Sequence, residues 1–217
     1  MPVITISREY GALGDEVGHG VAERLGLRYV DKEVVAEAAE LAGIPEPELA
    51  EAYERRPTFL ERFVVLGKAE RYADSMNQAL LRIAEDGDAV IMGRGSQMII
   101  PATPEVFHVR ITAPFEVRAH RTMDELHLDW HQAVAFIHRT DHTRALLHEV
   151  LFGIDWANPN LYDLVLNTGS ISVEASIDIL VSAIEAHQEK PCEERPLSHD
   201  DRVDPHEWGP FAPTTPW

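Results

Sequence analysis

Short apolar runs rich in β-branched residues alternate along this chain with longer stretches of helical periodicity, and this alternation constrains the fold most strongly. The apolar runs are residues 2–7, 27–30, 89–92, 106–111 and 162–167. Such short and nearly continuous apolar runs are typical of strands buried on both faces. Strands separated by helices usually form parallel sheets, because a parallel connection needs a long crossover. The sequence therefore predicts a three-layer α/β fold, in which helices cover both faces of a doubly wound parallel sheet.

Helical segments are predicted between these strands. In the first of them, Val17, Val21 and Leu25 recur at four-residue steps, and Gly26 is the expected stop. Residues 57–86 are predicted to form one long helix or two abutting ones. The other predicted helices occupy residues 31–43, 114–126, 129–152 and 172–187.

The carboxyl-terminal segment differs from the rest of the chain in composition. Residues 188–217 hold six prolines, many charges and few aliphatic side chains. This composition favours disorder or loose docking, whereas Trp208, Phe211 and Trp217 would suit a segment that docks on its own body or on a partner. We predict one domain, residues 1–187, followed by a proline-rich acidic tail, residues 188–217.

The charge balance excludes some classes of function. The chain has 19 Lys and Arg against 37 Asp and Glu, a formal net charge of −18. A general nucleic-acid binder needs basic patches, so no nucleic-acid partner is expected, although a small basic pocket remains compatible. No apolar run is long enough to span a membrane, and the start lacks the layout of a signal peptide, so no membrane association is expected. The single cysteine, Cys192, excludes an internal disulfide and fits a cytoplasmic protein.

Residues 8–14 form a turn that contains Gly11 and Gly14 and joins the first strand to the first helix. In such a turn the backbone N–H groups converge, and the dipole of the following helix favours negative charge. The segment is therefore a candidate anion site. Short glycine-containing turns are also common after strands, so the same pattern fits a turn that binds nothing.

From this turn onward the chain resembles the cytidylate-kinase-like family, a branch of the P-loop nucleoside monophosphate kinases. The resemblance begins at ITISREYGALGDEVGHGVAERLG and covers roughly residues 3–187 in the family's order, without the tail. The motifs that follow are YVDK at Tyr29, MGRG at Met92, VRITAPFEVRAHR at Val109, RTDHTR at Arg139 and YDLVLNT at Tyr162.

The resemblance implies a P-loop kinase fold with a helical insertion and a lid, and transfer of the ATP γ-phosphate to CMP or dCMP with Mg²⁺. It assigns the ATP phosphates to Arg8, Gly11, Ala12, Leu13, Gly14, Asp15 and Glu16. It assigns the acceptor to Asp31, Arg94, Arg118 and Arg121, and catalysis in the lid to Arg139, Asp141 and Arg144. Arginines suit this chemistry, since their planar forks bind phosphate oxygens and neutralise charge.

The acceptor residues each allow a simpler interpretation. Arg94 could pair with a neighbouring carboxylate, and Asp31 could cap the helix that begins there. Arg118 and Arg121 lie three residues apart on a helix with acidic neighbours, so surface ion pairs are an alternative. Gly95 stands where related cytidylate kinases carry an aspartate near the base, so this motif does not indicate cytosine specificity.

The lid residues face a geometric constraint. Arg139 and Arg144 are five residues apart, and positions at that spacing do not share a helical face. They would converge on a phosphate only where the helix ends or bends between them. A solvated helix face is the alternative interpretation.

The phosphate loop lacks the lysine and hydroxyl residue that normally end such a motif, because Gly14 is followed by Asp15 and Glu16. Exchanging a cation for an anion about 4 Å from a phosphate changes the interaction by several kcal/mol. Arg8 could compensate by folding back over the phosphates, and Glu16 or Asp15 could hold Mg²⁺. Alternatively, both acids merely stabilise the first turn of the helix.

Two main functional hypotheses follow. The first is a nucleoside monophosphate kinase that uses ATP and CMP or dCMP. The second is a catalytically impaired nucleotide-binding or regulatory protein that kept the acceptor pocket. A third rests on His127, His131, His138 and His142, which would share a face if residues 127–142 formed one straight helix. A metal site there competes with a solvated histidine row, the simpler interpretation.

Overall fold

The predicted strands pair into one parallel sheet in the computed structural model, which describes residues 1–42 and 69–190. The strand order is β2-β3-β1-β4-β5, so the first strand lies at the centre. Val3 of β1 pairs with Ala89 of β3 on one side and with Val106 of β4 on the other. The strands are β1 (Val3–Arg8), β2 (Arg28–Val30), β3 (Ala89–Met92), β4 (Val106–Thr112) and β5 (Leu164–Asn167).

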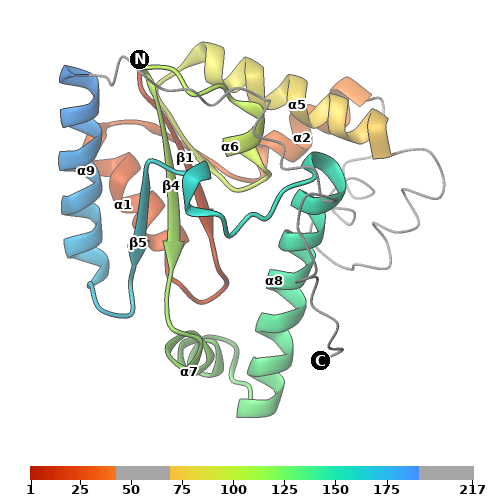
Figure 1. The fold of residues 1–217 in the computed structure, drawn as a ribbon, viewed down its shortest axis with the longest axis vertical. Coiled ribbons are helices and arrows are strands. Elements are labelled where there is room, and N and C mark those ends of the chain that lie inside the picture. Colours follow the sequence, from red (N-terminus) through yellow and green to blue (C-terminus); the bar gives the residue numbers. More distant parts are fainter. Residues whose placement is uncertain (43–68, 191–217) are drawn as a thin grey trace, which may run out of the picture.

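Helices cover both faces of this sheet, which confirms the predicted three-layer α/β architecture (Figure 1). The α-helices are α1 (Gly14–Leu25), α2 (Glu33–Ala42), α5 (Ala69–Asp86), α6 (Ser96–Ile99), α7 (Phe115–Leu126), α8 (Trp130–Phe152) and α9 (Val173–Glu189). A 3₁₀ turn, η1 (Pro159–Leu161), precedes β5. None of the described helices is both long and apolar enough to cross a membrane.

The side chains of β1 alternate between the two faces of the sheet and divide the apolar core into two clusters. Ile4 and Ile6 point toward α1 and α9, in one apolar cluster with Val17 and Leu180. Val3 belongs to the opposite cluster, which α2 and α5 complete. Successive strand residues point to opposite faces, so a strand covered on both sides reads as a continuous apolar run. This explains why the strand pattern was recognisable from sequence.

Some elements differ from the sequence-based expectation. The short helix α6 and the turn η1 were not predicted, because four and three residues are too few to show a period. The expected strand at residues 162–167 begins only at Leu164, since Tyr162 closes η1 through a hydrogen bond from its N–H to the Pro159 carbonyl. Of the helix expected at residues 57–86, only α5 lies within the described residues.

Helix α9 runs to Glu189, two residues past its predicted end at 187. The His187 ring lies 5.2 Å from the Phe107 ring, so the last residue of the predicted domain still packs on β4. Residues 191–217 lie outside the described residues, and the division into a domain and a tail stays a prediction.

Candidate active site

The segment between β1 and α1 forms an open turn with two residues in the left-handed region. Gly11 has φ 74°, and a Cβ there would lie 2.9 Å from the Arg118 carbonyl oxygen, so only glycine fits. Leu13, with φ 57°, caps α1 and makes no side-chain capping hydrogen bond. The N–H groups of Glu9, Tyr10 and Ala12 are already hydrogen-bonded within the protein. The first-turn N–H groups of a helix have no intrahelical partner, so the start of α1 supplies the backbone donors that an anion site needs.

Arg8 folds back over this turn from the end of β1. A Cβ on Gly14 would lie 2.5 Å from the Arg8 Cβ, so the glycine makes room for the arginine side chain. Arg8 Nη2 donates a 2.9 Å hydrogen bond to Asp15 Oδ1. The arginine therefore lies where the sequence analysis expected a compensating cation, and one of the two loop acids is its ion-pair partner.

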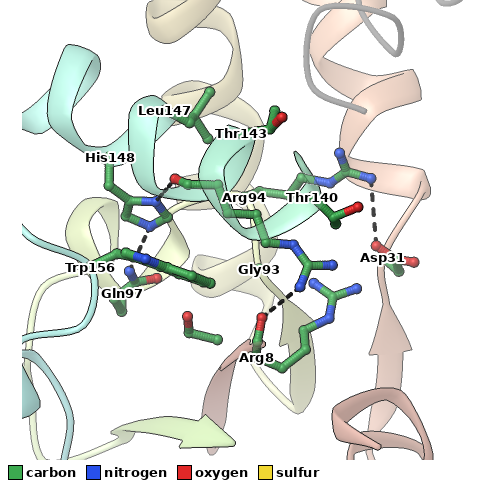
Figure 2. A pocket seen from close by; sticks show the side chains of 12 residues that line it. Arg8, Asp31, Gly93, Arg94, Gln97, Thr140, Thr143, Leu147, His148 and Trp156 are labelled. Atoms are coloured by element: carbon green, nitrogen blue, oxygen red, sulfur yellow. Dashed lines mark hydrogen bonds and ion pairs between the residues drawn. The ribbon is translucent and has the colours of Figure 1, made fainter. Parts of the chain in front are cut away.

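A cavity of about 240 Å³ opens where β1, β2 and β3 end, and α8 forms its other wall (Figure 2). It is lined by Ser7, Arg8, Asp31, Gly93, Arg94, Gln97, Thr140, Thr143, Arg144, Leu147, His148 and Trp156. A smaller cavity of about 130 Å³ lies over the turn and is lined by Arg8, Glu9, Tyr10, Gly11, Leu13, Gly14, Asp15, Glu16, Glu125 and Arg144. Arg8 and Arg144 line both, so these two guanidinium groups stand where the cavities meet.

Arg94 lies in a strained turn at the end of β3. Gly93, Arg94 and Gly95 all have positive φ, between 61° and 71°. For a residue with a side chain this backbone is costly, and such strain is found preferentially at functional sites. Arg94 Nη2 lies 3.6 Å from Asp31 Oδ1, so the structure brings the two predicted acceptor residues together in the larger cavity.

Arg144 reaches the same cavity from α8. Its Nη1 donates a 2.7 Å hydrogen bond to the Arg8 carbonyl oxygen, and it lies 3.9 Å from Asp141 Oδ1. Burial, together with the charge of Arg8, lowers the pKa of Arg144 to about 10, so the group is still a cation at neutral pH. Three guanidinium groups thus line one cavity of an acidic protein, an arrangement that favours an anionic ligand.

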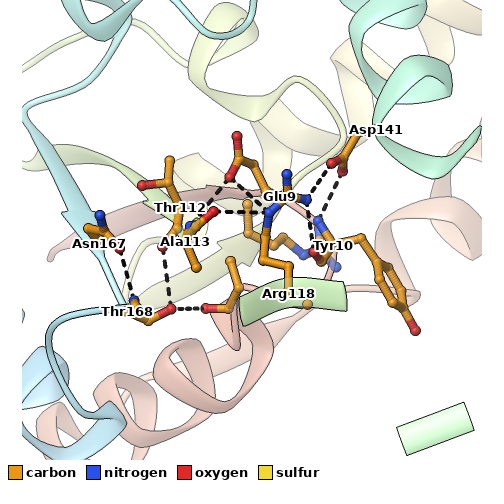
Figure 3. Close-up of polar contacts among 12 residues, drawn as sticks. Glu9, Tyr10, Thr112, Ala113, Arg118, Asp141, Asn167 and Thr168 are labelled. Carbon is orange, nitrogen blue, oxygen red and sulfur yellow. Dashed lines mark hydrogen bonds and ion pairs between the residues drawn. The ribbon is translucent and has the colours of Figure 1, made fainter. Parts of the chain in front are cut away.

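Arg118 and Asp141 lie beneath the turn instead of lining either cavity (Figure 3). Arg118 Nη1 donates to Asp141 Oδ2 at 2.6 Å and to the Tyr10 carbonyl at 3.1 Å, and its Nε lies 3.4 Å from a carboxylate oxygen of Glu9. The Tyr10 N–H donates to Asp141 Oδ1 at 3.0 Å. These contacts support the turn, and the roles predicted for Arg118 at the acceptor and for Asp141 in catalysis stay predictions.

Arg121 supports the turn from the side of β5. It donates hydrogen bonds to the Gly11 carbonyl at 3.2 Å and to the Thr168 carbonyl at 2.8 Å. The Thr168 hydroxyl in turn donates to the Ala12 carbonyl at 2.8 Å. These contacts differ from the surface pairing considered for Arg121, and they connect the final YDLVLNT motif to the loop.

The remaining lid candidate, Arg139, is exposed on α8, with its guanidinium 5.5 Å from the Phe136 ring centroid, and it lines neither cavity. The helix is continuous between Arg139 and Arg144, so the two do not converge here. The histidine row is also divided, since His127 closes α7 with φ 53° and α8 begins only at Trp130. Across residues 1–42 and 69–190, no group of three or more His, Cys, Asp or Glu is arranged to hold a metal ion.

Several residues around the cavities were missed by the sequence analysis. Arg110 of β4 is 3% exposed, donates to the Trp156 carbonyl at 3.0 Å and lies 4.3 Å from that residue's ring centroid. A basic residue inside a predicted buried strand was the available signal for it. Gln97 and His148 meet by a 2.9 Å hydrogen bond across 51 residues of sequence, and no local pattern indicated either one.

The parallel sheet, the open turn after its central strand and the arginine-lined cavity beside it define a P-loop kinase fold. The sequence model of the cytidylate kinase-like family matches residues 3–170, and the chain belongs to this family. A cytidylate kinase from Methanopyrus kandleri is 28% identical over 195 residues, covering 84% of this chain and 93% of that protein.

Solved structures agree with this fold. The crystal structure of an uncharacterized protein from Eubacterium ventriosum superposes with a TM-score of 0.67 at 20% identity, covering 86% of this chain and 99% of that one. A shikimate kinase from Bacteroides thetaiotaomicron gives a TM-score of 0.51 at 16% identity, with 85% and 98% covered. At these identities the likeness describes the fold alone.

Proposed function

We propose that this protein is a nucleoside monophosphate kinase that transfers the γ-phosphate of ATP to CMP or dCMP. The observation that carries the proposal is the position of Arg8 and Arg144, which line both the cavity over the phosphate turn and the larger cavity beside it. A kinase must hold two phosphorylated molecules end to end, with cations at the point where the phosphoryl group passes between them.

In this arrangement the turn after β1 binds the phosphates of ATP, and Arg94 holds the phosphate of the acceptor, with Asp31 beside it. An oxygen of the acceptor monophosphate attacks the γ-phosphorus, and the bond from that phosphorus to the β–γ bridging oxygen breaks, which releases ADP. Arg8 and Arg144 neutralise the charge on the transferred group. No covalent intermediate with the protein is needed.

The carboxylates at the turn fit a Mg²⁺ ion that is shared with the nucleotide. Glu16 is exposed and lines the smaller cavity, whereas Asp15 is paired with Arg8. Magnesium bound to nucleotides usually takes one or two protein carboxylates and several phosphate and water oxygens, so Glu16 is the residue that would contact it. The ion would supply further neutralisation of the phosphate charge.

The direct test is a coupled assay for ADP formation with ATP, Mg²⁺ and CMP or dCMP, together with melting temperatures in the presence of each nucleotide. We expect ADP formation that depends on the acceptor, and a higher melting temperature with either nucleotide, because ligands that bind the folded state stabilise it. If CMP raises the melting temperature while ATP does not and no ADP forms, the protein is instead the catalytically impaired nucleotide-binding protein.

Asp15→Asn is expected to increase the affinity for ATP about tenfold, because the Asp15 carboxylate competes with the incoming phosphates for Arg8. The dissociation constant of ATP, measured by calorimetry at fixed Mg²⁺, checks this. Asp86→Asn is the matched control, since Asp86 is an exposed acid at the far end of α5. Weaker ATP binding by Asp15→Asn would instead assign the carboxylate to Mg²⁺.

A further inference from the structure

One end of the larger cavity has no role in the phosphate chemistry above. Gln97, His148 and Trp156 line it on the side away from Arg94 and Asp31 (Figure 2). Gln97 and His148 are buried, with 7% and 5% of their surfaces exposed. Because the acceptor's phosphate is held by arginine at the other side, this end is left for the nucleoside.

The protonation of His148 follows from its partners. Its Nδ1 lies 2.7 Å from the Arg144 carbonyl oxygen, which can only accept a hydrogen bond, so Nδ1 carries a proton. Burial lowers the pKa of His148, so the ring is neutral at neutral pH. Its Nε2 therefore presents a lone pair and accepts a hydrogen bond.

Two acceptors then fix the side-chain amide of Gln97. Its Nε2 is 2.9 Å from His148 Nε2 and 3.5 Å from the Tyr162 hydroxyl oxygen. That hydroxyl donates its own proton to the Trp156 carbonyl at 2.7 Å, so toward Gln97 it acts as an acceptor. Only the amide NH₂ group satisfies both neighbours, because a flipped amide would set its oxygen against two lone pairs.

This arrangement leaves the amide oxygen of Gln97 without a hydrogen-bond donor from these neighbours. It is buried and has no hydrogen-bond partner among the residues that the structure describes. A buried acceptor without a donor destabilises a protein, and a ligand that brings a donor removes this cost. The oxygen therefore favours a ligand with an N–H group at this end of the cavity.

We propose that Gln97 determines base specificity by accepting a hydrogen bond from the exocyclic amino group of a cytosine base, with His148 holding the amide in this orientation. The inference rests on the proposed function for the position of the acceptor. UMP has a keto oxygen at the same ring position, which would face the Gln97 oxygen as a second acceptor. Sites built to pair with a donor discriminate strongly against analogues that lack it.

The test measures the dissociation constants of CMP and UMP by calorimetry, without ATP, for the wild type, Gln97→Met and Gln97→Glu. We expect the wild type to bind CMP at least about tenfold more tightly than UMP. Gln97→Met should lose this preference, because CMP loses its hydrogen-bond acceptor while UMP no longer faces an opposing oxygen. Gln97→Glu should keep it, because a carboxylate that shares a proton with His148 still offers an acceptor oxygen.

Gln78→Met is the matched control, since Gln78 is exposed on α5 and should leave both constants unchanged. Equal affinity of the wild type for CMP and UMP, or an unchanged ratio in Gln97→Met, would overturn the inference. A general packing defect would weaken the binding of CMP and of UMP by the same factor, which distinguishes it from a loss of base preference. Binding does not require phosphoryl transfer, so a preference for CMP without ADP formation contradicts only the kinase proposal. Equal turnover of CMP and UMP contradicts only the proposed role of Gln97 in base specificity.

Discussion

Arg144→Ala is expected to lower kcat for phosphoryl transfer to CMP about a thousandfold, with a much smaller change in the KM for CMP. Arg144 lines both cavities and hydrogen-bonds the Arg8 carbonyl, so it stands beside the proposed path of the phosphoryl group. Charge develops on that group in the transition state, and a fixed cation there acts more strongly on the transition state than on bound substrate. Initial rates of ADP formation over a range of CMP concentrations give both constants.

Two further variants make this result specific. Arg144→Lys keeps the charge but not the planar fork, so it should recover only part of the rate. Arg82→Ala changes an exposed arginine of α5 and should leave kcat unaltered. If Arg144→Ala retains kcat within about threefold of the wild type, Arg144 does not stabilise the transition state.

The strands and the longer helices could be predicted because their signals are local. In β1, Val3, Ile4 and Ile6 are buried by two different helical layers, and this double burial leaves a continuous apolar run in the sequence. The short elements α6 and η1 carry no such pattern. They depend on the left-handed turn at Gly93–Gly95 and on packing around Tyr162, which only the folded chain defines.

The cavity residues that follow directly on a strand were also accessible from sequence. Arg8, Asp31 and Arg94 each follow or end a strand, and the carboxyl ends of parallel strands meet at one edge of the sheet. The five-residue spacing of Arg139 and Arg144 required the helix to end or bend between them if both were to reach one point. The helix is continuous, and only Arg144 faces the cavity.

Contacts across long stretches of sequence were not predictable. Arg118 meets Tyr10 across 108 residues, and Arg121 meets Gly11 across 110. Both arginines carry the same charge as a phosphate-binding arginine, so the residue type gave no distinction. The neighbouring groups distinguish an arginine that supports the turn from one that binds phosphate. Around a supporting arginine, backbone carbonyls and carboxylates already occupy the N–H donors.

Arg118→Met is expected to lower the free energy of unfolding by about 3 kcal/mol, because it removes the central cation of a mostly buried network. Within the described part of the chain, Glu9 and Asp141 then keep only longer ion pairs, with Arg110 at 3.4 Å and with Arg144 at 3.9 Å. The Arg118 side chain is 9% exposed, and those of its partners Glu9 and Asp141 are 22% and 19% exposed. The variant also removes the donor to the Tyr10 carbonyl, so the phosphate turn loses part of its support. Urea denaturation of both proteins provides the measurement.

Arg24→Met is the matched control, because Arg24 also pairs with two acids, Glu174 and Asp178, but its side chain is 45% exposed. Water screens exposed ion pairs, so this variant should unfold at nearly the wild-type urea concentration. Adding Asp141→Asn to Arg118→Met should restore part of the lost stability, since it removes a carboxylate that has lost its shortest ion pair. If Arg118→Met costs no more than Arg24→Met, burial does not make this network stronger than a surface pair, and the support proposed for the turn must come from Arg121.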